Sequence, residues 1–198
     1  MRSFVGYCCA LALLAGLAGC AGTNFVRASA DTLKNGQTTY AQVVEKMGPP
    51  RREGTITKNE KQLKLVTFSY ATTGGKPVRE GVVPARAQTF YFYNDTLVGH
   101  EFGSSFAEDH SDFDDKKVAN IAKGKTTRAE VTQLIGKASG YYIYPLIASA
   151  TGDAAVYIYF ETTSDAPFSV KQFRKVLIVS FDASGLVSDV ELNSSRTQ

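Results

Sequence analysis

The sequence is poor in the side chains that carry most catalytic and metal chemistry: it has three cysteines, two histidines and no tryptophan. The cysteines, Cys8, Cys9 and Cys20, precede the rest of the chain, which therefore has no thiol for a disulfide or a thiolate metal site. His100 and His110 lack the spacing of a metal-ligand pair, and neither Gly-x-Ser-x-Gly nor His-Glu-x-x-His occurs. We expect no catalytic residues, no metal and no cofactor. The alternative to a non-enzymatic protein is a hydrolase whose active site has no recognisable motif.

The chain also lacks a strong charge of one sign, since 22 Lys and Arg balance 19 Asp and Glu for a net charge of +3. A nucleic-acid-binding domain normally concentrates far more positive charge, so we expect no nucleic-acid partner. A local basic run, residues 51–64, has two interpretations. It is either the solvated edge of the fold or a surface for anionic lipid phosphates.

The N-terminus has the pattern of a secretory signal. Arg2 supplies positive charge, residues 4–17 are uncharged and apolar, and small residues precede Cys20. We predict a signal peptide over residues 1–19. The alternative is a membrane-spanning helix over residues 4–22, which has about the minimum length of 17 to 25 residues.

Leu17-Ala18-Gly19-Cys20 resembles the lipobox of bacterial lipoproteins, which implies that Cys20 is lipidated and begins the mature chain. Several acyl chains on one cysteine give a stable membrane anchor. Ala21 stands where inner-membrane lipoproteins often carry aspartate, so the resemblance implies a lipid-anchored protein at the periplasmic face of the outer membrane. Residues 20–30 are then a lipidated tether.

The sequence contains an internal repeat. The segment from Asn35 to Val43 returns from Lys123 to Val131 at a constant offset (124 − 36 = 88), and both copies continue to a glycine, Gly48 and Gly136. A second block, residues 66–73, matches residues 156–163 at an offset of 90 (156 − 66 = 90). These matches predict two copies of a small domain, residues 31–106 and 107–198.

Each copy predicts two helices followed by strands. Thr39 with Gln42, and Thr127 with Glu130, have the spacing of a capping box at a helix N-terminus. In the first copy a weaker helical stretch, residues 24–34, precedes this helix. The predicted fold class is α+β: two tandem helix-helix-antiparallel-sheet repeats, which either share one sheet or form two.

Segments rich in β-branched and aromatic residues predict the strands. They are residues 63–73, 87–94, 96–103, 154–163, 176–182 and 186–193. In the first copy the alternation predicts that Val66 and Phe68 face the helices. In the second copy Val156, Ile158 and Phe160 alternate with Tyr157 and Tyr159, and we expect the first set to face the helices and the two tyrosines to lie on the open side.

Exposed aromatic side chains often mark a protein-binding surface, so Tyr157 and Tyr159 are the predicted partner-binding residues. The alternative is that the other repeat covers this face. In the segment from Phe90 to Tyr93 all four residues are aromatic, and the repeat alignment, which would turn Phe90 and Phe92 outward, leaves their orientation unsettled.

A mainly acidic segment lies between the two copies and includes Glu108, Asp109, His110, Asp112, Asp114 and Asp115. It is either a solvated linker that supplies acidic residues to the next helix or a site for a divalent cation.

The sequence resembles the SmpA/OmlA (BamE-like) outer-membrane lipoproteins in several motifs. These are the lipobox, the Gly-x-Thr-Thr block from Gly36 with Gln42-Val43 and Met47-Gly48-x-Pro50, and the aromatic pair Phe68 and Tyr70. The block recurs from Gly124 to Gly136. The resemblance implies a non-enzymatic accessory or scaffold factor in envelope or β-barrel protein assembly, with an envelope protein as partner and outer-membrane assembly components among the candidates. The tandem arrangement is also similar at fold level to β-lactamase inhibitor proteins. A periplasmic enzyme inhibitor or a ligand-binding envelope lipoprotein is therefore the alternative.

Overall fold

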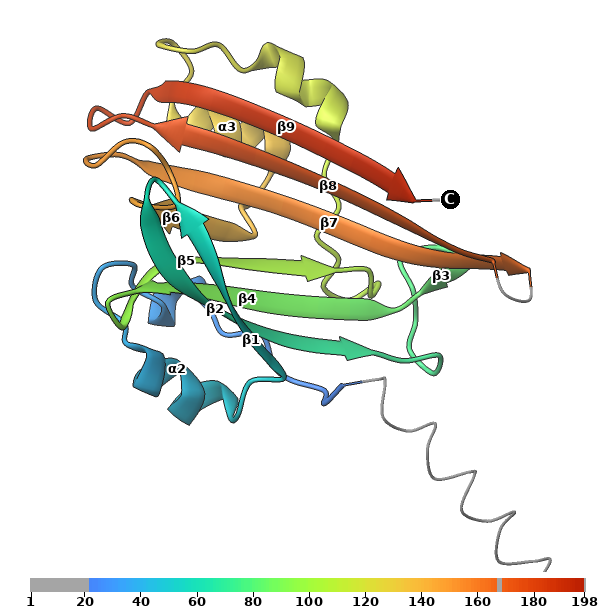
Figure 1. Cartoon of the computed structure of the whole chain (residues 1–198). Coiled ribbons are helices and arrows are strands. Elements are labelled where there is room, and N and C mark those ends of the chain that lie inside the picture. The colour runs from blue at the N-terminus through green and yellow to red at the C-terminus, as the bar shows by residue number, and fades with distance from the viewer. Residues whose placement is uncertain (1–21, 167–168, 198) are drawn as a thin grey trace, which may run out of the picture.

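The computed structural model describes residues 22–166 and 169–197 and consists mainly of one antiparallel sheet. The strands follow one another across the sheet in the order β1-β2-β4-β5-β6-β7-β8-β9, and β3 pairs with β7 (Figure 1). Their bounds are β1 Arg52–Lys58, β2 Lys61–Ala71, β3 Val82–Val83, β4 Ala85–Tyr93, β5 Thr96–Ser104, β6 Gly140–Ile143, β7 Asp153–Ala166, β8 Ser169–Phe181 and β9 Val187–Thr197.

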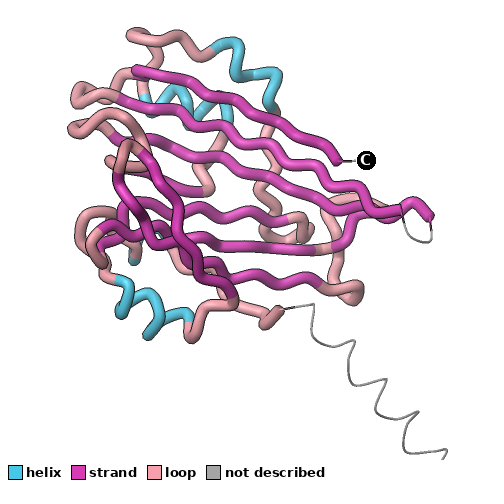
Figure 2. The backbone as a smooth tube through the Cα atoms, viewed as in Figure 1, coloured by secondary structure: helices cyan, strands magenta, loops and turns pink. Residues whose placement is uncertain are grey.

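The two copies of the repeat therefore share one continuous sheet, and the seam between them is the pairing of β5 with β6. Gly99 lies opposite Tyr142, and His100 lies opposite Tyr141. Next to this pair, the amide of Phe102 donates to the carbonyl of Ser139 over 3.1 Å. The unbroken run of strands is visible in Figure 2.

The described helices are short. The α-helices are α2, Tyr40–Met47, and α3, Arg128–Ile135, and 3-10 turns precede them at η2, Ala30–Thr32, and η3, Asp115–Asn120. The predicted capping boxes are confirmed: Thr39 and Thr127 each accept from the N3 amide, and the N3 side chain returns a bond to the amide of the cap. Each α-helix has a glycine with positive φ as its C-cap, Gly48 and Gly136.

The Gly-x-Thr-Thr block attaches each helix to the sheet in the same way. In the first copy Gly36 donates to the carbonyl of Leu97, whose own amide donates to Thr38, both over 2.8 Å. In the second copy Gly124 donates to Val187 over 2.7 Å, and the Val187 amide donates to Thr126 over 2.9 Å. The block is thus a structural connection between a helix and the last strand of its repeat.

Both α-helices pack on the same face of the sheet. Under α2, a core forms around Val43, Val66, Phe68, Phe90 and Phe92, which confirms the predicted orientation of Val66 and Phe68. Each fully buried aromatic ring of this kind contributes roughly 1.5 to 3 kcal/mol relative to an exposed one. The core under α3 contains Phe113, Val131, Ala155, Tyr157, Tyr159, Leu177, Val179 and Phe181.

The predicted fold class is wrong. Strands make up 48% of the chain and helices 15%, and the strands form one curled half-barrel instead of two helix-helix-sheet domains. The helix predicted over residues 24–34 is reduced to the three residues of η2. The backbone around Ala28 is instead extended: its amide donates to the buried side chain of Gln88 over 2.8 Å, and its carbonyl accepts from the same side chain over 3.1 Å. These bonds to the sheet replace those of a helix.

Candidate functional site

The face of the sheet away from the helices is the candidate functional site. Strand register places Leu65, Tyr91, Gly99, Tyr142 and Ala154 in one row across it. Tyr142 and Ala154 belong to a core that also contains Val156 and Ile147 and includes no helix residue. In Figure 1, α3 lies behind β8 and β9, so the view looks onto this helix-free face.

The helix-free face is one face of a curled half-barrel, and we refer to this face as the trough. The β1–β2 hairpin bends across the front of the sheet toward the loop that follows β6 (Figure 1). The contact is fixed by Asn59 at the hairpin turn, whose side-chain amide donates to the carbonyls of Pro145 and Ile147, each over 2.9 Å. The first repeat therefore reaches over the second, and the trough is bounded by both.

Two glycines of β5 allow side chains to lie across the seam. A Cβ on Gly99 would lie 2.6 Å from Cδ1 of Tyr142 and would also collide with Leu146. A Cβ on Gly103 would lie 2.6 Å from Cε1 of Phe160. Aromatic side chains of the second repeat therefore cover the glycine positions of the first, which fixes the two halves of the sheet against each other.

A buried carboxylate lies at the centre of the seam. Glu101, 8% exposed, accepts a hydrogen bond from the phenol of Tyr142. The ring of Tyr142 meets that of Tyr91 edge-on, with centroids 5.5 Å apart. Burial, followed by the charge of Glu101, raises the pKa of both phenols well above the ordinary value. The phenols thus stay protonated and act as hydrogen-bond donors.

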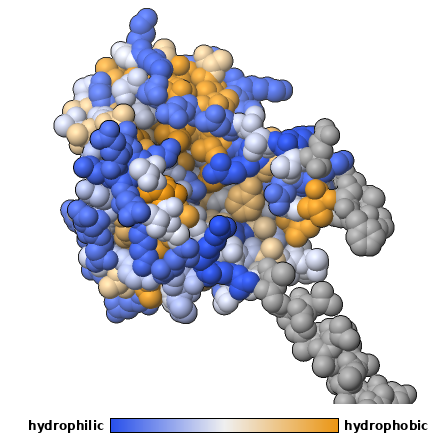
Figure 3. Space-filling view, viewed as in Figure 1, coloured by the Kyte–Doolittle hydropathy of each residue, from blue (hydrophilic) through white to orange (hydrophobic). Residues whose placement is uncertain are grey.

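Beside this cluster, the trough offers side chains suited to binding a protein. Phe160 and Ile178 are half-buried, and Arg174, opposite Phe160 in the register, is exposed. The positive charge of Arg174 acts on Tyr91 and partly offsets the rise of its pKa. Figure 3 shows hydrophobic side chains over the strands of the second repeat, bordered by hydrophilic ones. Half-buried aromatics beside an exposed arginine are typical of the residues that dominate protein interfaces.

The predicted partner-binding residues lie elsewhere. Tyr157 and Tyr159 are each 3% exposed and pack in the core under α3, so the expectation that they lie on the open side is wrong. Tyr157 donates to the carbonyl of Gly136 over 3.1 Å, and Tyr159 donates to Glu161 over 2.8 Å. The hydroxyl of each phenol is therefore used inside the fold.

The error comes from one residue of register. The register shifts fall after Tyr91 in β4 and after Ser180 in β8, an offset of 89 (180 − 91 = 89). Because Val66 pairs with Phe90 and Ala155 with Val179, β2 and β7 have the same offset of 89 (155 − 66 = 89) instead of 90. A shift by one residue turns every side chain of a strand to the other face. Val156 and Ile158, which were expected to face the helices, accordingly line the trough, while Phe90 and Phe92 face α2.

The acidic segment between the copies does not gather into a metal site. Asp109 lies 2.8 Å from Arg86, Asp112 lies 2.8 Å from Lys175, and Asp114 caps η3 by accepting from the amide of Lys116 over 3.1 Å. Within residues 22–166 and 169–197, no group of three or more His, Cys, Asp or Glu residues could hold a metal ion. The carboxylates thus serve as partners for basic side chains and as a helix cap.

The sequence analysis missed the seam, although β5 carries a signal for it. Glycines inside a strand often mark the close approach of another part of the chain, and Gly99 and Gly103 flank Glu101 in the printed sequence. The predicted lipidation site, Cys20, lies outside the described residues. Within the described part of the chain, we find no helix with the length and apolar character needed to cross a bilayer.

No protein-family model matches the chain, the SmpA/OmlA family included, and no curated protein matches it. Among solved structures, the chain is similar to a Streptococcus mutans protein provisionally named a β-lactamase inhibitor protein. The identity is 12%, the TM-score is 0.38, and the match covers 79% of this chain and 82% of the other.

Proposed function

We propose that this chain is a non-enzymatic, protein-binding lipoprotein of the cell envelope, anchored through Cys20 at the periplasmic face of the outer membrane, and that the trough is its binding surface. The lipobox-like Leu17–Cys20 segment supports the anchor and the location. The resemblance of its motifs to SmpA/OmlA lipoproteins makes outer-membrane assembly components candidate partners.

The observation that carries the proposal is the composition of the trough. Its aromatic, aliphatic and arginine side chains lie on a rigid sheet, and the Glu101–Tyr142 contact and the glycine contacts of β5 hold the two repeats in one orientation. Such preorganisation reduces the entropy lost on binding. A tightly packed surface of this kind suits an ordered protein partner.

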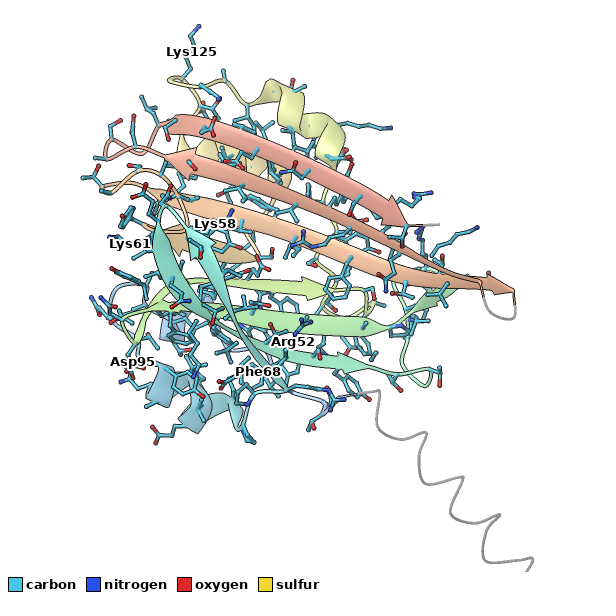
Figure 4. All side chains as sticks on the ribbon, in the orientation of Figure 1. Arg52, Lys58, Lys61, Phe68, Asp95 and Lys125 are labelled. Atoms are coloured by element: carbon cyan, nitrogen blue, oxygen red, sulfur yellow. The ribbon has the colours of Figure 1, made fainter. Side chains whose placement is uncertain are left out.

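A matched pair of variants tests this function. Arg174→Glu reverses a charge in the trough, whereas Lys125→Glu reverses one at the far end of the fold, in the exposed turn before α3 (Figure 4). Both side chains are exposed, so we expect neither change to unfold the protein. The full lipidated protein and both variants are used to capture partners from detergent-solubilised envelopes, and the captured proteins are identified by mass.

We expect Arg174→Glu to lose a partner that the unchanged protein and Lys125→Glu both retain. Loss of barrel-assembly components would support the accessory role, and loss of one periplasmic enzyme would point to an inhibitor. If all three proteins capture the same set in equal amounts, the trough is not the binding surface.

A further inference from the structure

The outer edge of β9 is an open strand edge. β9 is the last strand of the sheet and, among the described residues, no strand pairs with its outer side. Residues 191–197 are all exposed, and Leu192, 42% exposed, is one of the large apolar side chains that the fold leaves in contact with solvent. An edge of this length presents unpaired backbone groups that favour pairing with another strand.

The equivalent strand of the first copy, β5, pairs with another strand along the edge that corresponds to the open edge of β9. β5 and β9 occupy the same place in their copies at an offset of 90 (187 − 97 = 90), because Leu97 and Val187 form equivalent bonds with the Gly-x-Thr-Thr blocks. Both strands also have a β-bulge at the equivalent position, next to Gly99 and Asp189. Beyond that point β5 is covered by β6, whereas no strand of the described residues covers β9. β9 therefore has the edge geometry that accepts an antiparallel strand.

The offset of 90 between β5 and β9 also predicts which backbone groups of β9 point toward its open edge. The Phe102 amide of β5 points across the seam and donates to Ser139. Leu192 is the equivalent residue of β9 (192 − 102 = 90), so its amide and carbonyl point to the open edge.

The other edge of the sheet is protected against self-pairing. β1 carries Arg52 at one end and Lys58 at the other, both exposed (Figure 4). In an antiparallel pair of two β1 strands these cations would lie opposite each other, which is destabilising. β9 contains no proline and no lysine, and its one cation, Arg196, lies near its end.

We propose that β9 binds β9 of a second copy of this chain as an antiparallel pair centred on Leu192. The pairing is two-fold symmetric and self-complementary: each Leu192 faces the other, Glu191 faces Asn193, and Asp189 faces Ser195. No like charges lie directly opposite one another. The sheet then continues through both copies, with the two troughs on the same side.

Engineered cysteines test the register. In the full chain, Leu192→Cys places two thiols opposite each other at a Cα separation of about 5.5 Å, within the range of a disulfide. Thr55→Cys on β1 is the matched control, because Thr55 is exposed in the middle of the other edge strand. We expect mild oxidation to give a covalent dimer for Leu192→Cys only, above the background of the natural cysteines. Equal amounts of dimer for both variants would overturn the proposal. If Leu192→Cys crosslinks to a different protein instead, the strand that pairs with β9 does not come from a second copy of this chain.

A second measurement needs no crosslink. Leu192→Lys would place two cations opposite each other and is expected to raise the dissociation constant of the dimer by about tenfold or more, as measured by sedimentation equilibrium of the detergent-solubilised chain. Thr55→Lys and Arg174→Glu should sediment as the unchanged protein does, and circular dichroism should show all variants folded. A monomeric unchanged protein overturns the proposal. Arg174 lies on β8, one strand in from the pairing edge, so an Arg174→Glu protein that loses partner capture but keeps the dimer separates the two proposals.

Discussion

The phenol of Tyr142 donates a hydrogen bond to the carboxylate of Glu101 across the junction of the two repeats. Glu101 belongs to β5, the last strand of the first repeat, and Tyr142 belongs to β6, the first strand of the second. Both side chains are buried, so the charge of Glu101 depends on donors from the neighbouring repeat for its stabilisation. This hydrogen bond adds to the β5–β6 pairing and the glycine contacts that hold the two repeats in one orientation.

Removal of the Tyr142 hydroxyl should therefore destabilise the whole sheet. Tyr142→Phe leaves the buried carboxylate of Glu101 without this donor, and we expect a loss of about 1 to 3 kcal/mol in the free energy of unfolding. Denaturant unfolding of Tyr142→Phe, Glu101→Gln and the double variant gives the coupling energy. Strictly additive losses would mean that the hydrogen bond does not link the repeats.

The glycine at position 103 should be intolerant of a side chain. Gly103→Ala places a methyl group 2.6 Å from Phe160 and is expected to cost about 1 to 3 kcal/mol. Gly54→Ala is the control, since the nearest atom to its added methyl group is 3.9 Å away. Phe160→Leu in the Gly103→Ala background should recover part of the loss. Equal melting temperatures for the two alanine variants would contradict the close packing at the seam.

The capping boxes should make equal contributions in the two copies. Thr39→Ala and Thr127→Ala each remove a bond to an N3 amide, and we expect each to lower the free energy of unfolding by about 1 kcal/mol. Thr132→Ala, in the middle of α3, loses only a bond to the carbonyl of Arg128 within the same helix and should be nearly neutral. A much larger loss at one cap than at the other would show that the copies are not energetically equivalent.

The stability should fall in mild acid because of His100. This residue is 3% exposed, and burial, followed by the charge of Arg27, lowers its pKa to about 4. Since the unfolded chain takes up a proton near the ordinary pKa of about 6.5, stability is fully present above that pH and declines as the pH falls toward 4. The difference corresponds to about 3 kcal/mol for this group.

Comparison with variants isolates this effect from the carboxylates, which also titrate in acid. His100→Gln should lose stability less steeply between pH 6.5 and 4 than the unchanged protein. His110→Gln, at an exposed position, should keep the original slope. Parallel curves for all three proteins would show that His100 does not titrate differently in the folded and unfolded states.

Much of the local structure could be predicted from the sequence. Thr39 with Gln42 and Thr127 with Glu130 mark helix starts because a capping box involves neighbouring residues alone. The six predicted strands all exist, since runs of β-branched and aromatic residues favour an extended chain. β1, β3 and β6 were missed: β1 is mostly polar, with residues such as Arg52, and β3 and β6 are only two and four residues long.

The faces of the strands were only partly predictable. Val66 and Phe68 were placed correctly from their alternation, whereas the alternation in the second copy was assigned to the wrong faces, so Tyr157 and Tyr159 were misplaced. The sequence similarity of the copies is weakest in the strands, and a turn of different length separates β8 from β9. The register shifts after Tyr91 and Ser180, together with the pairing of the strands, define the offset.

By itself, the sequence determined the two capped helices, the Gly-x-Thr-Thr connections and most of the strands, because each depends on interactions between residues close along the chain. The tertiary structure alone decided that β5 pairs with β6, that the repeats form one curled sheet, and that Glu101 lies buried beside Tyr142. Those features depend on which strands pair with each other. The pairing is determined by packing between residues about forty positions apart in the sequence, such as Glu101 and Tyr142.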